Sequence, residues 1–198
     1  MFKDPDGKSF GCVTSIYRDG KDNSLWVGTD GSGIVRITAA GRRTIYNSEN
    51  SGLGSDAVMA LEKDGDGILW IATYQGGLYR YADGNIRAFR DNPRIGSAKI
   101  ADLAYDSSRN LLYAGTHGGG LSIIDPASET VVRTIADDSN KWVSALYVDR
   151  SGMLWVGTFN GPFCYNHATG KMVRYDVGDR SMNSRVYCFC ESRDGRCG

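Results

Sequence analysis

The sequence predicts an all-β protein, a β-propeller whose blades are four-stranded antiparallel sheets. One short phrase recurs four times, and its aromatic residue falls at Trp26, Trp70, Tyr113 and Trp155, at spacings of 44, 43 and 42 residues. Each copy holds four short β-prone segments divided by Gly, Asp and Asn turns, as in a four-stranded meander. No stretch keeps a 3.6-residue apolar period, so we expect almost no helix. A four-stranded unit that repeats at this interval is typical of a propeller blade.

The four segments of a copy are expected to form strands A to D, from the propeller axis outward. Strand A is expected at "VTSIY", "VMALE", "IADLAY" and "VSALYV". Strand B is the recurring phrase, for example "GMLWVGT". Strand C is expected at "GIVRI", "GGLYRY", "GGLSII" and "GPFCYN", and strand D at "RRTIY", "NIRAF", "TVVRTI" and "KMVRY".

Strand B should be apolar on both faces, because each blade is covered by its neighbours. Trp155 and Gly157 share one face of this strand, and we expect the glycine to leave room for the indole. A glycine-rich turn then leads to strand C. In the fourth copy Pro162 replaces a glycine, so Asn160 and Gly161 must make that turn.

Full blades are expected at about 13–47, 58–91, 100–136 and 143–176. The same register puts partial blades in residues 1–12 and 186–198. Residues 1–198 are therefore predicted to be a single segment of a larger propeller, about seven-bladed as is usual for the type. The alternative is a complete four-bladed domain with a spare tail. Open blade faces in a segment predict self-association.

The charge balance of the chain argues against some classes of binding partner. The chain carries 23 basic and 23 acidic residues. This balance argues against nucleic acid or direct membrane contact held by bulk charge. No apolar run is long enough to cross a bilayer, and "MFKDPDGKSFG" does not resemble a secretion signal. The chain is expected to be either cytosolic or a piece of a longer exported protein.

The cysteines are odd in number and irregularly spaced: Cys12, Cys164, Cys188, Cys190 and Cys197. The C-x-C pair has no second pair at zinc-site spacing, and the chain has only two histidines. We predict that the cysteines are small buried residues and that the chain holds neither a metal nor a cofactor.

The repeat follows the pattern V-x-x-[IL]-x-x-D-x-x-G-x-L-W-[VI]-G-T-x-x-G-G-L. The fourth copy fits it best, with Val143, Leu146, Asp149, Gly152, Leu154, Trp155, Val156, Gly157 and Thr158. The second copy has Ala72 in place of a glycine, the third has Tyr113 in place of tryptophan, and the first is one residue longer. The pattern resembles the two-component regulator propeller repeat, and the resemblance covers essentially the whole chain.

The resemblance implies a non-catalytic sensor segment from the extracytoplasmic part of a hybrid two-component sensor kinase of the Bacteroides type. It implies a periplasmic location, contact with other domains of the parent sensor, and an oligosaccharide from glycan breakdown as ligand. A cytoplasmic location is the alternative. A protein-interaction scaffold is the second function considered, and a propeller lyase or glycosidase is the third.

Candidate contact residues lie on the face where the B–C and D–A loops open, which is usually the ligand face of a propeller. The residue after each repeated threonine occupies the B–C turn and varies between copies: Asp30, Tyr74, His117 and Phe159. Trp142 ends a D–A loop on the same face. Aromatic side chains beside polar groups suit sugar faces and partner proteins alike. The alternative is that these are scattered exposed aromatic residues.

No catalytic residue is predicted. The sequence offers no nucleophile–base pair, phosphate loop or metal-binding histidine pair. A lyase-type site would have to use His117. The "DGDG" at Asp64 lacks the spacing of a calcium loop and is interpreted as an A–B hairpin turn.

Overall fold

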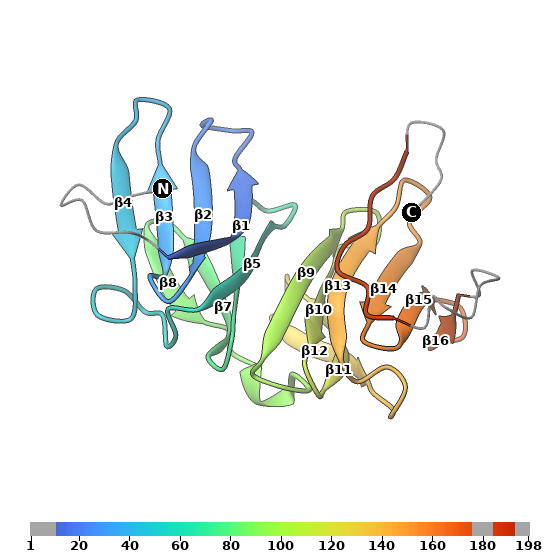
Figure 1. The fold of residues 1–198 in the computed structure, drawn as a ribbon. Coiled ribbons are helices and arrows are strands. Elements are labelled where there is room, and N and C mark those ends of the chain that lie inside the picture. Colours follow the sequence, from blue (N-terminus) through green and yellow to red (C-terminus); the bar gives the residue numbers. More distant parts are fainter. Residues whose placement is uncertain (1–10, 176–183, 193–198) are drawn as a thin grey trace. The chain divides into compact units, whose positions relative to one another are not determined.

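The computed structural model describes residues 11–175 and 184–192, and within them the chain forms four antiparallel four-stranded sheets (Figure 1). The first sheet holds β1 (Cys12–Arg18), β2 (Leu25–Asp30), β3 (Ile34–Ile37) and β4 (Arg43–Tyr46). The second holds β5 (Val58–Lys63), β6 (Leu69–Thr73), β7 (Gly77–Ala82) and β8 (Asn85–Ala88). The third holds β9 (Ile100–Asp106), β10 (Leu111–Thr116), β11 (Gly120–Asp125) and β12 (Thr130–Ile135). The fourth holds β13 (Val143–Val148), β14 (Leu154–Thr158), β15 (Gly161–Asn166) and β16 (Lys171–Arg174).

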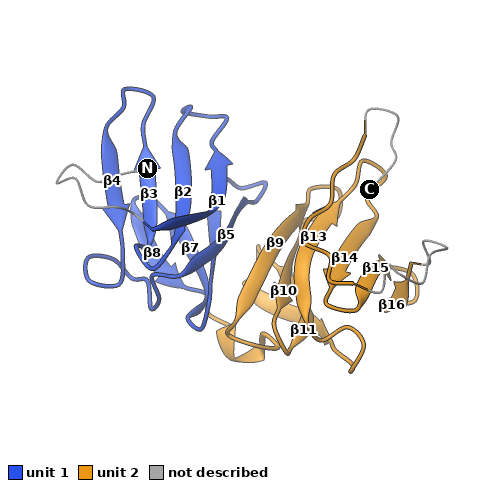
Figure 2. Ribbon diagram, viewed as in Figure 1, with its two compact units in different colours: residues 1–89 blue, residues 90–198 orange. Residues whose placement is uncertain are grey.

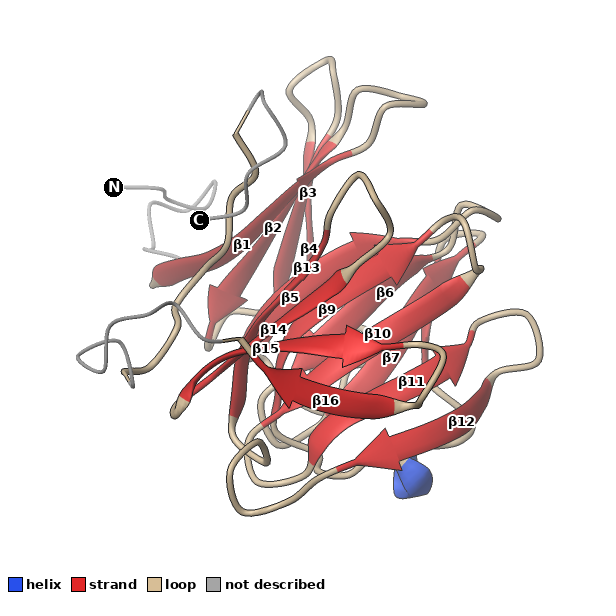
Figure 3. Cartoon of the chain, turned by 90° about the vertical axis from the view of Figure 1, so that its right-hand side faces the viewer, coloured by secondary structure: helices blue, strands red, loops and turns tan. Residues whose placement is uncertain are grey.

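The strands of each sheet follow one another in sequence order, so every sheet is a meander. Strands and loops account for nearly all of the described chain, as Figure 3 shows. The helix in this part of the chain is a single 3-10 turn, η1 (Asn92–Arg94), which is far too short to cross a lipid bilayer. The predicted all-β class and its four-stranded units are confirmed.

The chain divides into two compact units, residues 1–89 with the first two sheets and residues 90–198 with the last two (Figure 2). In unit 1, the inner strand β5 lies against β1 and β2 of the preceding sheet. In unit 2, β13 lies in the same way against β9 and β10. Each unit is therefore a pair of neighbouring blades that meet through their inner strands.

The inner strand of every sheet carries a β-bulge that the sequence pattern does not announce. The register against strand B shifts between Val13 and Ser15, between Val58 and Ala60, between Val143 and Ala145, and opposite Gly115–Thr116 in the third sheet. Two bulged residues reach the next inner segment of the chain, which is β5 for Thr14 and residues 184–192 for Ser144. The Thr14 hydroxyl donates to the Val58 carbonyl, and the Ser144 hydroxyl donates to the Val186 carbonyl at 2.6 Å. The bulges therefore help to join neighbouring inner strands.

The recurring aromatic residues lie in the core, with one exception. Trp26, Trp70 and Tyr113 are buried. Trp155, for which the register predicts the same burial, is only half-buried, so that prediction is wrong for the fourth copy. Its indole lies edge-on to the Tyr175 ring at 4.9 Å between ring centres, and Tyr175 is itself exposed.

In three copies a glycine lies two residues after the aromatic position, and its purpose differs from the one predicted. A Cβ atom on Gly157 would lie 2.8 Å from Cγ1 of Val186, at the start of the next inner segment. A Cβ on Gly115 would collide with Val143 in the same way, and one on Gly28 would meet Val58. The glycines therefore make room for the next inner strand and not for the indole.

The Asp that recurs in the A–B turns ties the turn to strand B. In the second sheet, Asp64 Oδ1 accepts hydrogen bonds from the amides of Asp66 and Ile68, and Oδ2 accepts one from the Trp70 indole at 2.7 Å. Asp149 receives the Trp155 indole N–H at 2.9 Å in the fourth sheet. The interpretation of "DGDG" as a hairpin turn agrees with this geometry, since the Asp64 carboxylate is occupied by the turn itself.

Candidate functional site

The B–C turns share one construction, in which a buried threonine hydroxyl closes the turn on a glycine carbonyl. Four buried threonine hydroxyls, those of Thr29, Thr73, Thr116 and Thr158, each donate to a glycine carbonyl on the other side of the turn at 2.8–3.0 Å. That glycine has a positive φ in every copy, between 72° and 108°. The turn backbone is therefore fixed by the threonine and the glycine, and the residue after the threonine has no role in closing it.

In unit 1 the predicted contact residues are Asp30 and Tyr74. Asp30 is exposed at the end of β2 and forms a β-bridge with Ala57, the residue that precedes β5. Tyr74 is half-buried, and its amide donates to the Ala57 carbonyl at 2.8 Å. Ala57 therefore lies beside both turns of this unit, but contributes only a methyl group.

In unit 2 the corresponding position before β13 is Trp142, and three predicted residues meet there. Trp142 forms a β-bridge with His117 of the third sheet, and its carbonyl accepts the amide of Phe159 in the fourth. The ring centres lie 5.9 Å apart for His117 and Trp142, 5.3 Å for His117 and Phe159, and 5.6 Å for Trp142 and Phe159. The structure thus brings together residues that are 25 and 17 positions apart in the sequence.

Arg185 completes this group, and the sequence analysis missed it. Its guanidinium carbon lies 4.2 Å from the centre of the Phe159 ring and 4.9 Å from that of Tyr187. The neighbouring Val186 amide donates to the Thr158 carbonyl, which holds this segment against the fourth B–C turn. A signal was present: Arg185 precedes the fifth strand-A segment, as Trp142 precedes the fourth. We refer to His117, Trp142, Phe159 and Arg185 as the turn cluster.

The turn cluster is electropositive. Burial lowers the pKa of His117 below its usual value, and the positive charges of Arg185 and Lys99 lower it further. The imidazole is therefore uncharged at neutral pH. In the adjoining D–A loop, Asp137 is engaged by Ser139 and Asn140, and Asp138 pairs with Lys141 at 2.7 Å.

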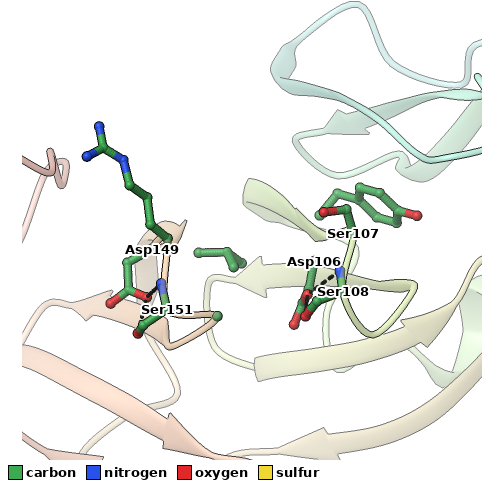
Figure 4. Close-up of a pocket in the computed structure, with 9 residues that line it drawn as sticks. Asp106, Ser107, Ser108, Asp149 and Ser151 are labelled. Atoms are coloured by element: carbon green, nitrogen blue, oxygen red, sulfur yellow. Dashed lines mark hydrogen bonds between the residues drawn. The ribbon is translucent and has the colours of Figure 1, made fainter. Parts of the chain in front are cut away.

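A hollow lies at the ends of the strands opposite to the turn cluster, between the A–B turns of the third and fourth sheets (Figure 4). It is an open cleft of about 300 Å³, lined by residues 105–108 and 148–152. Its two carboxylates, the buried one of Asp106 and the half-buried one of Asp149, serve their own turns. Asp106 accepts from the amide and hydroxyl of Ser108, and Asp149 accepts from those of Ser151. Their remaining oxygens bind Arg109 and Trp155, so the cleft offers no spare carboxylate for a ligand.

The cysteines differ from the prediction. Cys12, Cys188 and Cys190 are exposed and Cys164 is half-buried, so they are not the small buried residues that the sequence suggested; Cys197 lies outside the described residues. Between residues 11 and 175 and between 184 and 192, the structure holds no group of three His, Cys, Asp or Glu side chains that could bind a metal ion.

Comparison with known proteins finds a matching family model in two parts of the chain and solved structures of similar fold. The family model described as "two component regulator propeller" matches residues 52–75 and 137–160. Histidine kinase P4 of Formosa agariphila is 26% identical over 166 residues, which are 77% of this chain and 12% of that protein. The chain therefore spans about an eighth of this curated relative.

Two solved structures share the fold at low identity. The extracellular domain of the candidate hybrid two-component system BT4673 from B. thetaiotaomicron matches with a TM-score of 0.77 and 18% identity, over 99% of this chain and 27% of that one. Virginiamycin B lyase from Staphylococcus aureus matches with a TM-score of 0.76 and 15% identity, over 96% of this chain and 63% of the lyase. These likenesses confirm the predicted propeller fold.

Proposed function

This chain carries the repeats of the two-component regulator propeller family, and on that premise we propose that it is a non-catalytic, ligand-recognising part of a two-component sensor. The parent protein would display residues 1–198, as one propeller segment, in the periplasm beside the other domains of the sensor. The relative named as a histidine kinase and the extracellular domain of similar fold support this proposal. A propeller fold alone does not specify a function, so the argument depends on the site.

The observation that carries the proposal is the turn cluster. Four side chains from four separate segments meet where the B–C and D–A loops open, and none of them is needed to close a turn. Trp142 is 39% exposed although its ring contacts both His117 and Phe159. An indole that is held in place and left open to solvent suits the apolar face of a sugar ring. We therefore propose an oligosaccharide ligand.

A direct binding experiment tests this function. The full chain is titrated with a panel of neutral and acidic oligosaccharides, and binding is followed by calorimetry. We expect one class to bind and the variant Trp142→Ala to lose most of the affinity. Met153→Ala is the matched control, because Met153 is also 39% exposed but lies at the A–B turns. Binding that survives Trp142→Ala, or no binding to any member of the panel, contradicts the proposal.

An enzymatic function is the alternative to the sensor proposal, because a lyase shares the fold. A lyase or glycosidase would need a base that acts on the substrate, and His117 is the residue of the turn cluster that could serve. We expect no turnover of polysaccharide or lactone substrates by this chain. Turnover that disappears in His117→Ala would overturn the non-catalytic proposal. A scaffold function would instead appear as binding to a protein partner that competes with no saccharide.

We also propose that the chain associates with itself. Two apolar residues of the inner strand β1 are exposed, Val13 and Ile16, the latter at 64%. Apolar residues of this size on an inner blade strand normally lie against another blade. Light scattering across a range of concentrations, with a reducing agent present, should show mass that rises with concentration and falls in Ile16→Lys. A constant monomeric mass contradicts this proposal.

A further inference from the structure

We infer that the turn cluster binds an anionic group, so that its ligand is a saccharide that carries a carboxylate or sulfate close to the sugar face covered by Trp142. This inference rests on the proposed saccharide-sensing function and adds the substrate class. It is carried by the position of Arg185, by the neutral and aromatic surroundings of its charge, and by the short path from the guanidinium to the exposed indole.

Arg185 is arranged as an anion-binding group. Its guanidinium carbon lies over two aromatic rings, 4.2 Å from the centre of the Phe159 ring and 4.9 Å from that of Tyr187. A guanidinium that stacks in this way keeps the N–H groups at its edge for oxygen acceptors. Within residues 11–175 and 184–192, no carboxylate forms an ion pair with Arg185. A planar fork of donors matches a carboxylate or sulfate, which it can bind through two parallel hydrogen bonds.

The surroundings of Arg185 do not compensate its charge. The three turn residues that contact one another beside it are His117, Trp142 and Phe159, none of which is acidic. The His117 amide donates to the carbonyl of Lys99, so a second basic residue borders the same turn. The acidic residues of the adjoining loop, Asp137 and Asp138, are already engaged by neighbouring side chains. Among the described residues, the charge of Arg185 is therefore not paired with a carboxylate, and an external anion can use it.

The distances place the Arg185 guanidinium and the exposed Trp142 indole in one site. The Phe159 ring centre is 5.6 Å from that of Trp142 and 4.2 Å from the Arg185 guanidinium. One or two sugar rings can therefore cover the indole while a substituent reaches the guanidinium. A nucleic acid would call for a row of phosphate contacts, and the chain as a whole has no net charge to support one. An acidic saccharide could contact the Trp142 indole with its ring and the Arg185 guanidinium with its anionic group.

The test compares ligands that differ only in charge. The full chain is titrated with trigalacturonic acid and with its methyl ester, which keeps the sugar rings but removes the negative charges. Galactose 6-sulfate and galactose form the second pair and distinguish sulfate from carboxylate as the anion. We expect the charged member of at least one pair to bind at least about 10-fold more tightly, the order expected for a hydrogen bond to a charged group. Added salt should weaken binding of that member only.

Variants assign the charge preference to Arg185. Arg185→Gln should remove the difference between the charged and neutral members while leaving residual binding to both. Arg185→Lys keeps the charge without the planar fork and should lie in between. Arg133→Gln on the outer strand β12 removes an exposed arginine of the same unit and should change nothing. Circular dichroism confirms that each variant is folded.

The outcomes separate this inference from the function beneath it. If charged and neutral saccharides bind equally and Arg185→Gln has no effect, the anionic class is wrong while saccharide recognition stands. If no saccharide binds, both proposals fail. If only an acidic protein or peptide binds, the anion site is real but the substrate class proposed here is wrong.

Discussion

At the scale of single residues, His117 reports on the charge around the turn cluster. Its pKa is lowered by burial and then by the positive charges of Arg185 and Lys99. Removing one of those charges makes the protonated imidazole less unfavourable, so Arg185→Gln should raise the pKa of His117. An NMR titration of the imidazole protons measures this directly, because the chain has only two histidines.

The second histidine provides the internal control. The pKa of His167 is lowered by burial and by the positive charge of Arg109, not of Arg185. We therefore expect its titration to be the same in the parent and in Arg185→Gln. Arg133→Gln should leave both histidines unchanged. A His117 titration that does not move in Arg185→Gln would mean that the guanidinium is not beside the cluster in solution.

The site could be predicted in part at this scale. Repetition separated the residues that build the turn, such as Thr158, from the residue after it, which varies freely. Periodicity alone placed Phe159 and Trp142 on one face, and in unit 2 the two rings do lie together. Arg185 was not predicted as a site residue, because a cation–π contact depends on side-chain direction, which sequence spacing does not reveal.

At the scale of the blade, Trp70 links the A–B turn to strand B. Its ring is fully buried, and its N–H donates to Asp64, which also accepts two turn amides. Trp70→Ala should therefore lower the free energy of unfolding by roughly 3–5 kcal/mol, as other large aromatic truncations do. Denaturant unfolding followed by circular dichroism measures this change. A loss under about 1 kcal/mol, far below the usual cost of such truncations, would exclude the indole as a core element.

Trp155 allows a comparison within the same fold. It makes the equivalent hydrogen bond to Asp149, but its ring is only half-buried and one of its ring contacts is to the exposed Tyr175. Less apolar area is lost when it is truncated, so Trp155→Ala should cost clearly less than Trp70→Ala. The same unfolding measurement ranks the two variants. Equal losses would show that the hydrogen bond, and not burial, dominates the contribution of the indole.

Packing between blades depends on the glycine of strand B. A methyl group on Gly115 would collide with Val143 of the next inner strand, so the two strands would have to move apart. Gly115→Ala should destabilise unit 2 by roughly 1–3 kcal/mol, the usual cost of overpacking. Gly20→Ala is the matched control, since its added methyl meets nothing within 4 Å. Thermal unfolding of the two variants gives the comparison, and similar melting temperatures would contradict this account of the glycine.

At the scale of the whole molecule, the architecture was predictable because one unit is repeated. A register of 42 to 44 residues fixes four strands, three turns and their order at once, and single departures such as Tyr113 do not disturb it. The features that could not be predicted depend on contacts with neighbouring segments and not on the repeat itself. At the bulges of Thr14 and Ser144, a hydroxyl donates to the carbonyl of the next inner segment, a contact that the repeat pattern does not reveal. The exposure of Cys188 and the half-burial of Trp155 depend on what lies beside each blade.

The half-buried carboxylate of Asp102 links two inner strands and makes stability depend on pH. Asp102 on β9 accepts the amide of Leu103 at 2.9 Å and, across the sheets, the amide of Leu146 on β13 at 2.7 Å. Burial raises the pKa of Asp102 to about 6, although both amides act to lower it. The folded state therefore binds a proton more tightly than the unfolded chain, where an aspartate titrates near 4. This contribution is present below about pH 4 and is lost as the pH rises to about 6.

Asp102→Asn isolates this contribution from the other carboxylates. Several of these, including Asp19 and Asp149, have lowered pKa values and contribute in the opposite direction, so the parent curve alone does not reveal Asp102. We expect the stability of Asp102→Asn relative to the parent to rise by up to about 3 kcal/mol between pH 4 and pH 7, at 1.36 kcal/mol per pKa unit. Denaturant unfolding at each pH measures the difference. Leu103→Ala removes no titratable group from the same strand, so its difference from the parent should stay constant. If the Asp102→Asn difference is equally constant, the carboxylate is not held between the inner strands as its two hydrogen bonds imply.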